Sequence, residues 1–97
     1  MYYDKEAKPI NAMEWMALFD DPNYQRISRT EIGDYIVSTV WLGLDHNYGD
    51  GDPVIFETMV FDKKGDDVGQ RRYCTLAQAA RGHMEMVVEA EELASRE

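Results

Sequence analysis

Hydrophobic residues are densest between positions 35 and 61, where two β-prone runs flank a polar loop. The first run covers residues 35–44 (YIVSTVWLGL) and the second covers residues 54–61 (VIFETMVF). Branched and aromatic side chains pack well on a pleated surface, and both alternating sets of side chains are largely apolar, which is typical of central strands. Because successive strands usually pair, the two runs predict an antiparallel hairpin with residues 45–53 as its loop.

Two polar segments flank this hairpin and also alternate with the period of a strand. Residues 24–31 (YQRISRTE) and 68–74 (VGQRRYC) carry charged side chains, which discourage unwanted pairing along a sheet edge. Gly33 and Asp34 supply the turn before the hairpin, and residues 62–67 (DKKGDD) supply a solvated turn after it. We therefore predict four strands, with the polar pair at or near the edges.

A capping box predicts a short helix near the N-terminus. Asn11 and Glu14 have the required spacing, so the helix covers residues 12–19, and Pro22 disfavours helix at the residue before it. The helix carries five large apolar side chains: Met13, Trp15, Met16, Leu18 and Phe19. Their usual burial preferences predict packing in the core rather than a ligand-binding box.

A second capping box, formed by Thr75 and Gln78, predicts that the last helix begins at Leu76. A helical spacing of apolar residues predicts the face that lies across the sheet: Leu76, Ala79, Ala80, Met84, Val87 and Val88, with His83 beside it. Gly82 weakens a helix by about 1 kcal/mol relative to alanine, so its presence indicates a close backbone approach. Beyond Leu93 the helix is expected to fray.

The order of these elements is helix, four strands, helix. The simplest arrangement is a four-stranded antiparallel meander, with the short N-terminal helix and the long C-terminal helix packed on one face. A chain of 97 residues buries only about two-thirds of its unfolded surface, so one compact core is the limit. We therefore predict a single α+β domain over residues 1–97.

The chain is acidic, with a formal net charge of -9 from 19 acidic and 10 basic residues. Such a surface repels nucleic acid, so a nucleic-acid partner is not expected. The charge either serves solubility or lets the protein compete with nucleic acid for a basic partner. The spacing of the acidic residues leaves both interpretations open.

Composition also bears on the compartment. No apolar run approaches the ~20 residues of a membrane span, and residues 1–10 contain no apolar signal-peptide core. Cys74 is the single cysteine, which excludes an internal disulfide and suits a reducing compartment. We therefore expect no membrane partner and a cytoplasmic location.

The loop between the two central strands holds the most chemically suggestive residues. Residues 45–52 (DHNYGDGD) contain three carboxylates and an imidazole, but Gly49 and Asp50 break the calcium-loop pattern, and zinc would need more nitrogen or sulfur ligands than His46. We therefore expect neither a metal nor a cofactor. Long loops on rigid hairpins often carry function, so we predict a partner-binding site at Asp45, His46, Tyr48, Asp50 and Asp52.

Few residues suggest catalysis. His83 could pair with Cys74 or His46 as base and nucleophile, although a packed histidine is the simpler interpretation. Cys74 precedes a helix whose N-terminus can lower a thiol pKa, although many such cysteines are small buried hydrophobes. Glu57 lies inside an apolar strand and would need a second carboxylate for acid–base chemistry. We predict no catalytic residue.

Four arginines, Arg26, Arg29, Arg71 and Arg72, lie in the two polar strands. If those strands are neighbours, the arginines form a basic stripe interleaved with Tyr24 and Tyr73, which is typical of a surface for single-stranded nucleic acid. If the strand order is sequential, they lie on opposite edges of the sheet and pair with the acidic excess.

Several short motifs resemble those of a family of small bacteriophage proteins, found mainly in phages of actinobacteria. The motifs are YYD at residues 2–4, EW at 14–15, LF at 18–19, STVWLGLDH at 38–46, GDG at 49–51, IFETMVF at 55–61, RY at 72–73, Thr75, and GH at 82–83. The family has no known activity, cofactor or catalytic residues. The resemblance implies a phage origin and a location in the cytoplasm of an infected cell.

These observations rank three classes of function. The first is a non-enzymatic phage accessory protein that binds a host protein, for example as an inhibitor of bacterial defence. The second is a module that binds nucleic acid or nucleotides through the arginine and tyrosine strands, and the third is a small metal-dependent enzyme, which the absence of a motif disfavours. A homo-oligomer stays open, because apolar strands in so small a chain can need extra cover.

Overall fold

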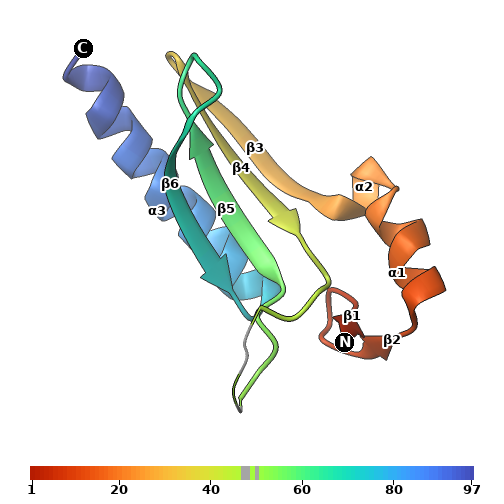
Figure 1. Ribbon diagram of the computed structural model, residues 1–97. Coiled ribbons are helices and arrows are strands. Elements are labelled where there is room, and N and C mark those ends of the chain that lie inside the picture. Colours follow the sequence, from red (N-terminus) through yellow and green to blue (C-terminus); the bar gives the residue numbers. More distant parts are fainter. Residues whose placement is uncertain (47–48, 50) are drawn as a thin grey trace.

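Four antiparallel strands in sequential order form the main sheet of the computed structural model, which describes residues 1–46, 49 and 51–97 (Figure 1). The strands are β3 (Arg26–Ile32), β4 (Tyr35–Trp41), β5 (Phe56–Phe61) and β6 (Asp67–Tyr73). Each pairs with the next along the chain, so β3 and β6 are the edges. The predicted hairpin and the predicted meander are confirmed.

The long helix α3 (Leu76–Ser95) lies across one face of this sheet and contacts all four strands (Figure 1). It begins as the sequence predicts, because Thr75 accepts a hydrogen bond from the Gln78 backbone and Gln78 bonds back to the Thr75 backbone. It remains helical two residues beyond Leu93. None of the helices in the described part of the chain is long and apolar enough to cross a membrane.

The short helix α1 (Ala12–Phe19) also has the predicted bounds and the predicted capping box between Asn11 and Glu14. It reaches the sheet only at the end of β4. There the Trp41 side chain, on the same face as the α3-facing Val37, meets Phe19 at a ring-centroid distance of 6.4 Å. Helix α3 therefore covers the sheet face, whereas α1 lies beyond the end of the strands, away from α3 (Figure 1).

The start of β3 differs from the prediction. Tyr24 and Gln25 belong to a one-turn helix, α2 (Pro22–Gln25), instead of extending the strand. Asp21 caps this turn by accepting a hydrogen bond from the Asn23 backbone, and Pro22 occupies the first helical position, where its fixed φ is favourable. The residues that end α1 thus begin a second helix, which polar alternation alone did not reveal.

Two very short strands precede α1. β1 (Tyr2–Tyr3) pairs with β2 (Pro9–Ile10), and the Asp4 carboxylate closes the turn between them by accepting hydrogen bonds from the backbones of Glu6 and Lys8. The sequence patterns described above do not predict this pairing. Tyr2 also bridges to Leu44, so this small sheet lies against the chain that leaves β4.

The buried face of α3 is not the predicted one. The residues that face the sheet are Ala79, Gly82, His83, Met86, Val87 and Ala90. Only Ala79 and Val87 of the predicted stripe are buried, whereas Met84 is 62% exposed and Val88 53% exposed. Two overlapping apolar stripes run along this helix. The stripe that contains the small residues Ala79, Gly82 and Ala90 is the buried one, because small residues let the helix come close to the sheet.

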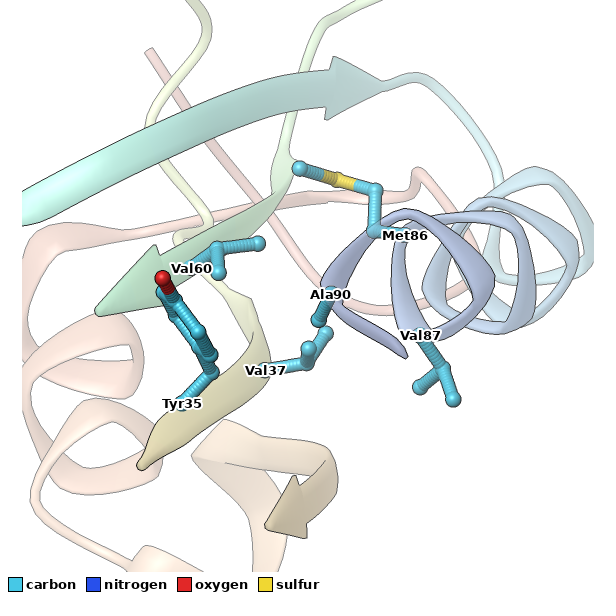
Figure 2. Packing of buried hydrophobic residues seen from close by; sticks show 6 residues of the cluster. All are labelled: Tyr35, Val37, Val60, Met86, Val87 and Ala90. Carbon is cyan, nitrogen blue, oxygen red and sulfur yellow. The ribbon is translucent and has the colours of Figure 1, made fainter. Parts of the chain in front are cut away.

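The core consists of two clusters along this single face. One joins Tyr35, Val37 and Val60 of the central strands to Met86, Val87 and Ala90 of α3 (Figure 2). The other gathers around Trp41, Phe56 and Tyr73 at the other end of the sheet, and side chains of the N-terminal segment pack against it. Both strands of the β4–β5 hairpin thus contribute side chains to the layer beneath α3.

Gly82 is the point of closest approach between α3 and the sheet. A Cβ atom at this position would lie 2.2 Å from the Tyr73 ring, well inside van der Waals contact. The close approach that the sequence indicates is therefore present.

We expect Gly82→Ala to destabilise the protein although alanine favours helices. Overpacking typically costs about 1–3 kcal/mol, which equals or exceeds the ~1 kcal/mol gained in helix propensity, and the Cβ contact at position 82 is very short. Urea unfolding would measure the change in the free energy of unfolding. Ala80→Gly, at an exposed position of the same helix, is the matched control and should cost about 1 kcal/mol by propensity alone. A rise in stability for Gly82→Ala would contradict the close packing.

Candidate functional site

The base of the predicted partner-binding loop is well tied to the hairpin. Asp45 accepts a hydrogen bond from the Val54 backbone at 2.9 Å, and the His46 backbone donates to the Val54 carbonyl at 2.9 Å. The carbonyl of Asp52 accepts a long contact from the Cys74 thiol at 3.8 Å. The structure therefore brings Asp45, His46 and Asp52 to one end of the sheet, where α3 begins.

Tyr48 and Asp50 lie outside the described residues, so their part in the loop stays a prediction. Within the described part of the chain, no three His, Cys, Asp or Glu side chains come together as ligands for a metal ion. Asp45 is already engaged at the base of the loop. The loop remains a candidate for contact with a partner.

His83 is the chemically most distinctive buried group. The ring is 2% exposed, with Nδ1 2.7 Å from the Thr39 hydroxyl and Nε2 2.9 Å from the Thr30 hydroxyl. Thr39 in turn bonds the hydroxyl of Thr58, which places the network across β3, β4 and β5. A neutral imidazole offers one donor and one acceptor, and hydroxyls can take either role, so each ring nitrogen is satisfied.

Burial lowers the pKa of His83 because desolvation disfavours its charged form. Both ring nitrogens are occupied by protein hydroxyls, and the ring is enclosed beneath α3. His83 is thus a packed histidine, as the simpler interpretation of the sequence has it, although it makes two hydrogen bonds to the sheet. A neutral, polar contact of this kind fixes the lateral position of α3 over the strands.

Cys74 does not have the activated thiol that its position before a helix suggests. Burial raises the pKa of this half-buried thiol, and the nearby carboxylates of Asp52 and Asp45 raise it further. The Cys74 backbone N–H donates to the Gln78 side chain as part of the helix cap. The structure therefore favours the simpler interpretation of Cys74 as a partly buried, unactivated thiol, since burial and nearby negative charge both raise its pKa.

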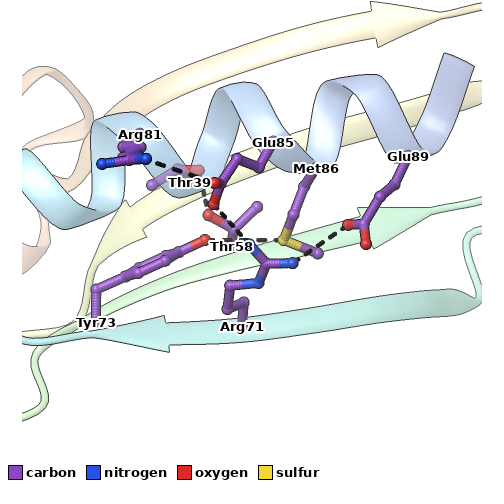
Figure 3. Close-up of polar contacts among 8 residues, drawn as sticks. All are labelled: Thr39, Thr58, Arg71, Tyr73, Arg81, Glu85, Met86 and Glu89. Carbon is purple, nitrogen blue, oxygen red and sulfur yellow. Dashed lines mark hydrogen bonds and ion pairs between the residues drawn. The ribbon is translucent and has the colours of Figure 1, made fainter.

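The four arginines lie on opposite edges of the sheet, as the sequential strand order requires. Arg71 points to α3 and binds Glu85 at 3.0 Å and Glu89 at 3.5 Å (Figure 3). Arg72 lies on the opposite face, where it binds Glu57 at 2.9 Å.

The two arginines of β3 lie on the other edge. Arg26 and Arg29 share a face with Arg72, because their register partners Val40 and Ser38 belong to the set opposite Val37. Arg29 pairs with Glu31 at 2.9 Å. Tyr24 and Tyr73 are drawn into the core cluster around Trp41, so no stripe with interleaved tyrosines forms.

The sheet face turned away from α3 is only partly covered. Ile36, Val40, Met59 and Phe61 lie there at intermediate exposure, and α3, the helix that contacts all four strands, lies on the other face. Glu57 on the same face accepts hydrogen bonds from Arg72 and Gln70, which supports the simple interpretation of this residue as an arginine partner. This face therefore combines apolar side chains with ion pairs that are already complete.

A groove of about 350 Å³ lies between β6 and the C-terminal half of α3. Gly69 keeps it open, and apolar side chains of Val60, Met86 and Leu93 line it. The Arg71–Glu89 ion pair belongs to its wall, so these two charged groups already neutralise each other. The groove is the space that remains where α3 packs beside β6, and we assign no ligand to it.

The side chains of helix α1 are far more exposed than the sequence predicts. None of its residues is buried; Met13 is 81% exposed, Met16 57% and Phe19 38%. The prediction that its large apolar residues pack in the core is wrong for these three. The burial preference of a residue type assumes that another element lies opposite. Here Trp15 and Leu18 pack against the core cluster, and Phe19 meets Trp41 with one side of its ring, but the two methionines have no such neighbour among the described contacts.

Trp15 attaches α1 to the rest of the protein. Its ring stacks on Tyr2 at 4.8 Å and on Phe19 at 4.9 Å, and its Nε1 donates to the Leu42 carbonyl at 2.9 Å. Gly43 allows this contact, because its φ is +73° and a Cβ would lie 2.6 Å from the indole. One side of α1 is thus fixed by aromatic packing, and the methionine side is left outside.

No protein-family model, no curated protein and no solved structure matches this chain. The function must therefore be argued from the chain's own surfaces. The described residues offer a buried polar network, a loop base that is hydrogen-bonded to the hairpin, and exposed apolar side chains on α1 and on the outer side of α3.

We expect the buried histidine to make stability depend on pH. The unfolded chain binds a proton at His83 near its ordinary pKa of 6.5, whereas the folded protein does so only at lower pH. The free energy of unfolding should hold above that value and fall as pH drops below it, by at most about 1.4 kcal/mol per pH unit for one proton.

Urea unfolding between neutral and mildly acidic pH would measure this slope. His83→Gln should lower stability throughout and remove the histidine part of the slope. His46→Gln, which changes the other histidine of the chain, is the control and should keep it. An unchanged slope in His83→Gln would show that His83 is not the group responsible.

Proposed function

We propose that this protein is a non-enzymatic accessory protein that acts by binding another protein, and that its target is a host protein in a phage-infected bacterium. The observation that carries the proposal is the distribution of side chains on α1 and in the core. Met13 and Met16 face solvent, although neither is needed to complete the fold. His83 and Cys74, which could do chemistry, are instead enclosed or half-buried.

This distribution favours recognition over catalysis. An active site needs an accessible nucleophile, acid or base with a pKa suited to its task. The pKa of the Cys74 thiol is raised, which reduces its thiolate fraction, and the ring nitrogens of His83 bond only to threonine hydroxyls. Exposed large apolar side chains, in contrast, often mark sites of protein–protein contact.

The charge of the chain supports a basic target. A net charge of -9 draws a positively charged partner toward the protein and repels nucleic acid. Proteins that bind nucleic acid present basic surfaces, so an acidic protein can compete for them. Bacterial defence machinery that acts on nucleic acid is one such class of host target, which agrees with a role as an inhibitor.

The loop after β4 is the first site to test. We expect its combined substitution to abolish capture of the host partner without unfolding the domain: Asp45→Asn, His46→Gln, Tyr48→Ser, Asp50→Asn and Asp52→Asn. Asparagine keeps an oxygen that can accept the Val54 hydrogen bond, so stability should change by less than about 1 kcal/mol. Affinity purification from host lysate, compared between variant and parent, is the measurement.

The turns at the other end of the sheet supply a matched control. Asp34→Asn, Asp66→Asn and Asp67→Asn remove the same number of carboxylates, and these residues are all exposed. This control should retain the partner. Equal recovery by the loop variant and the parent would exclude the loop as the contact, and recovery of no partner by the parent would count against the binding function itself.

A further inference from the structure

The N-terminal segment, residues 1–25, extends the molecule beyond its core. The radius of gyration is 14.2 Å, against about 12.5 Å expected for a compact chain of this length, and the principal extents are 45 × 27 × 20 Å. Figure 1 shows α1 and the β1–β2 pair standing at the end of the sheet, away from α3. The protein thus presents α1 on a projection rather than within its globular part.

Met13 and Met16 lie three positions apart on α1 and therefore share one side of the helix. They are 81% and 57% exposed, whereas Trp15, in the same turns, packs against Tyr2 and Phe19. Methionine is flexible and polarizable, so it adapts to apolar surfaces of varied shape and is common at binding surfaces. The side of α1 that does not serve the fold is the side that carries the methionines.

The segment that carries this surface is acidic, and residues 9–25 contain no Lys or Arg. The N-terminal segment has five carboxylates against two ammonium groups, which leaves a net side-chain charge of -3: Asp4, Glu6, Glu14, Asp20 and Asp21 against Lys5 and Lys8. Lys8 is paired with Glu6 at 3.4 Å, and Lys5 lies 4.1 Å from the centre of the Tyr24 ring.

Three of these carboxylates are held in place by backbone groups. Asp4, Glu14 and Asp21 accept hydrogen bonds from backbone N–H groups of turns and helix caps. Asp20, which caps the end of α1, is four positions after Met16 and therefore lies on the same side of the helix. An apolar surface on such an acidic segment is complementary to an apolar surface with a basic border.

We propose that the Met13–Met16 side of α1 is a docking surface for a protein segment that presents apolar side chains flanked by Lys or Arg. This inference rests on the proposed function and names the chemistry of the partner. A second copy of the chain is disfavoured as the occupant, because two segments of net negative charge would face each other across the interface. The surface is separate from the loop after β4, so the two sites are tested independently.

The six methionines of the chain provide the test, because each reports on a different part of the molecule. Met13 and Met16 report on α1, Met59 on the open sheet face, Met84 on the outer side of α3, Met86 on the core and Met1 on the N-terminus. The protein, labelled with ¹³C at the methionine methyl groups, is titrated with a short synthetic leucine–lysine peptide. We expect shifts at the Met13 and Met16 methyl signals and none at Met59, Met84 or Met86.

Two further peptides separate charge from apolar contact. A serine–lysine peptide of equal charge and a leucine–glutamate peptide of equal apolar content should both leave the Met13 and Met16 signals unchanged. Shifts of similar size with either peptide, shifts confined to Met59 or Met84, or no shift at all would overturn the proposal. Concentration-dependent shifts at Met13 without peptide would replace the partner with a second copy.

A pair of substitutions completes the experiment. Met13→Gln with Met16→Gln should weaken binding of the leucine–lysine peptide by about tenfold or more, as for interface anchor residues, while the unfolding midpoint stays unchanged because both side chains are exposed. Met84→Gln is the matched control and should bind like the parent. If the α1 variant loses the peptide but still captures the host partner, this inference fails and the proposed function stands; a parent that captures no partner removes the proposed function instead.

Discussion

The contact between Gly82 and Tyr73 determines how α3 lies on the sheet, and much of the structure follows from it. A Cβ at position 82 would collide with the ring, so only a glycine lets the helix backbone come this close. Once that face is chosen, His83 is carried to the threonine hydroxyls of β3 and β4, and Met86 and Ala90 meet the central strands. The alternative apolar stripe is left on the outside of the helix.

The threonines beneath α3 complement this packing with polar specificity. Thr39 and Thr58 are fully buried, and among the described residues no buried side-chain nitrogen or oxygen lacks a hydrogen-bond partner. A buried polar group is costly when it is unpaired, so a sideways shift of α3 would break bonds that water could not replace. Gly82 sets the distance between α3 and the sheet, and His83 sets the lateral position of α3 over the strands.

Local chemistry made much of the fold predictable, and the failures have a common cause. The caps at Asn11 and Thr75 and the two central strands depend on neighbouring residues, which the sequence displays directly. The buried side of α3 and the exposure of Met13 depend instead on what lies opposite in space. The sequence shows that Asp45, His46 and Asp52 share a loop, and the structure places them together; whether they contact a partner depends on a second molecule, which no single chain displays.

The division of α1 into two sides links the fold to the proposed function. Trp15 joins the helix to Gly43 and Tyr2 through a contact that needs a glycine with positive φ, so the attachment is as specific as the core itself. A helix kept only for its capping and aromatic packing would be served equally well by polar helix formers such as Lys or Gln on its other side, since apolar groups left in water bring no burial energy. Their presence on a firmly attached, acidic projection is the observation on which the proposed recognition of a basic partner depends.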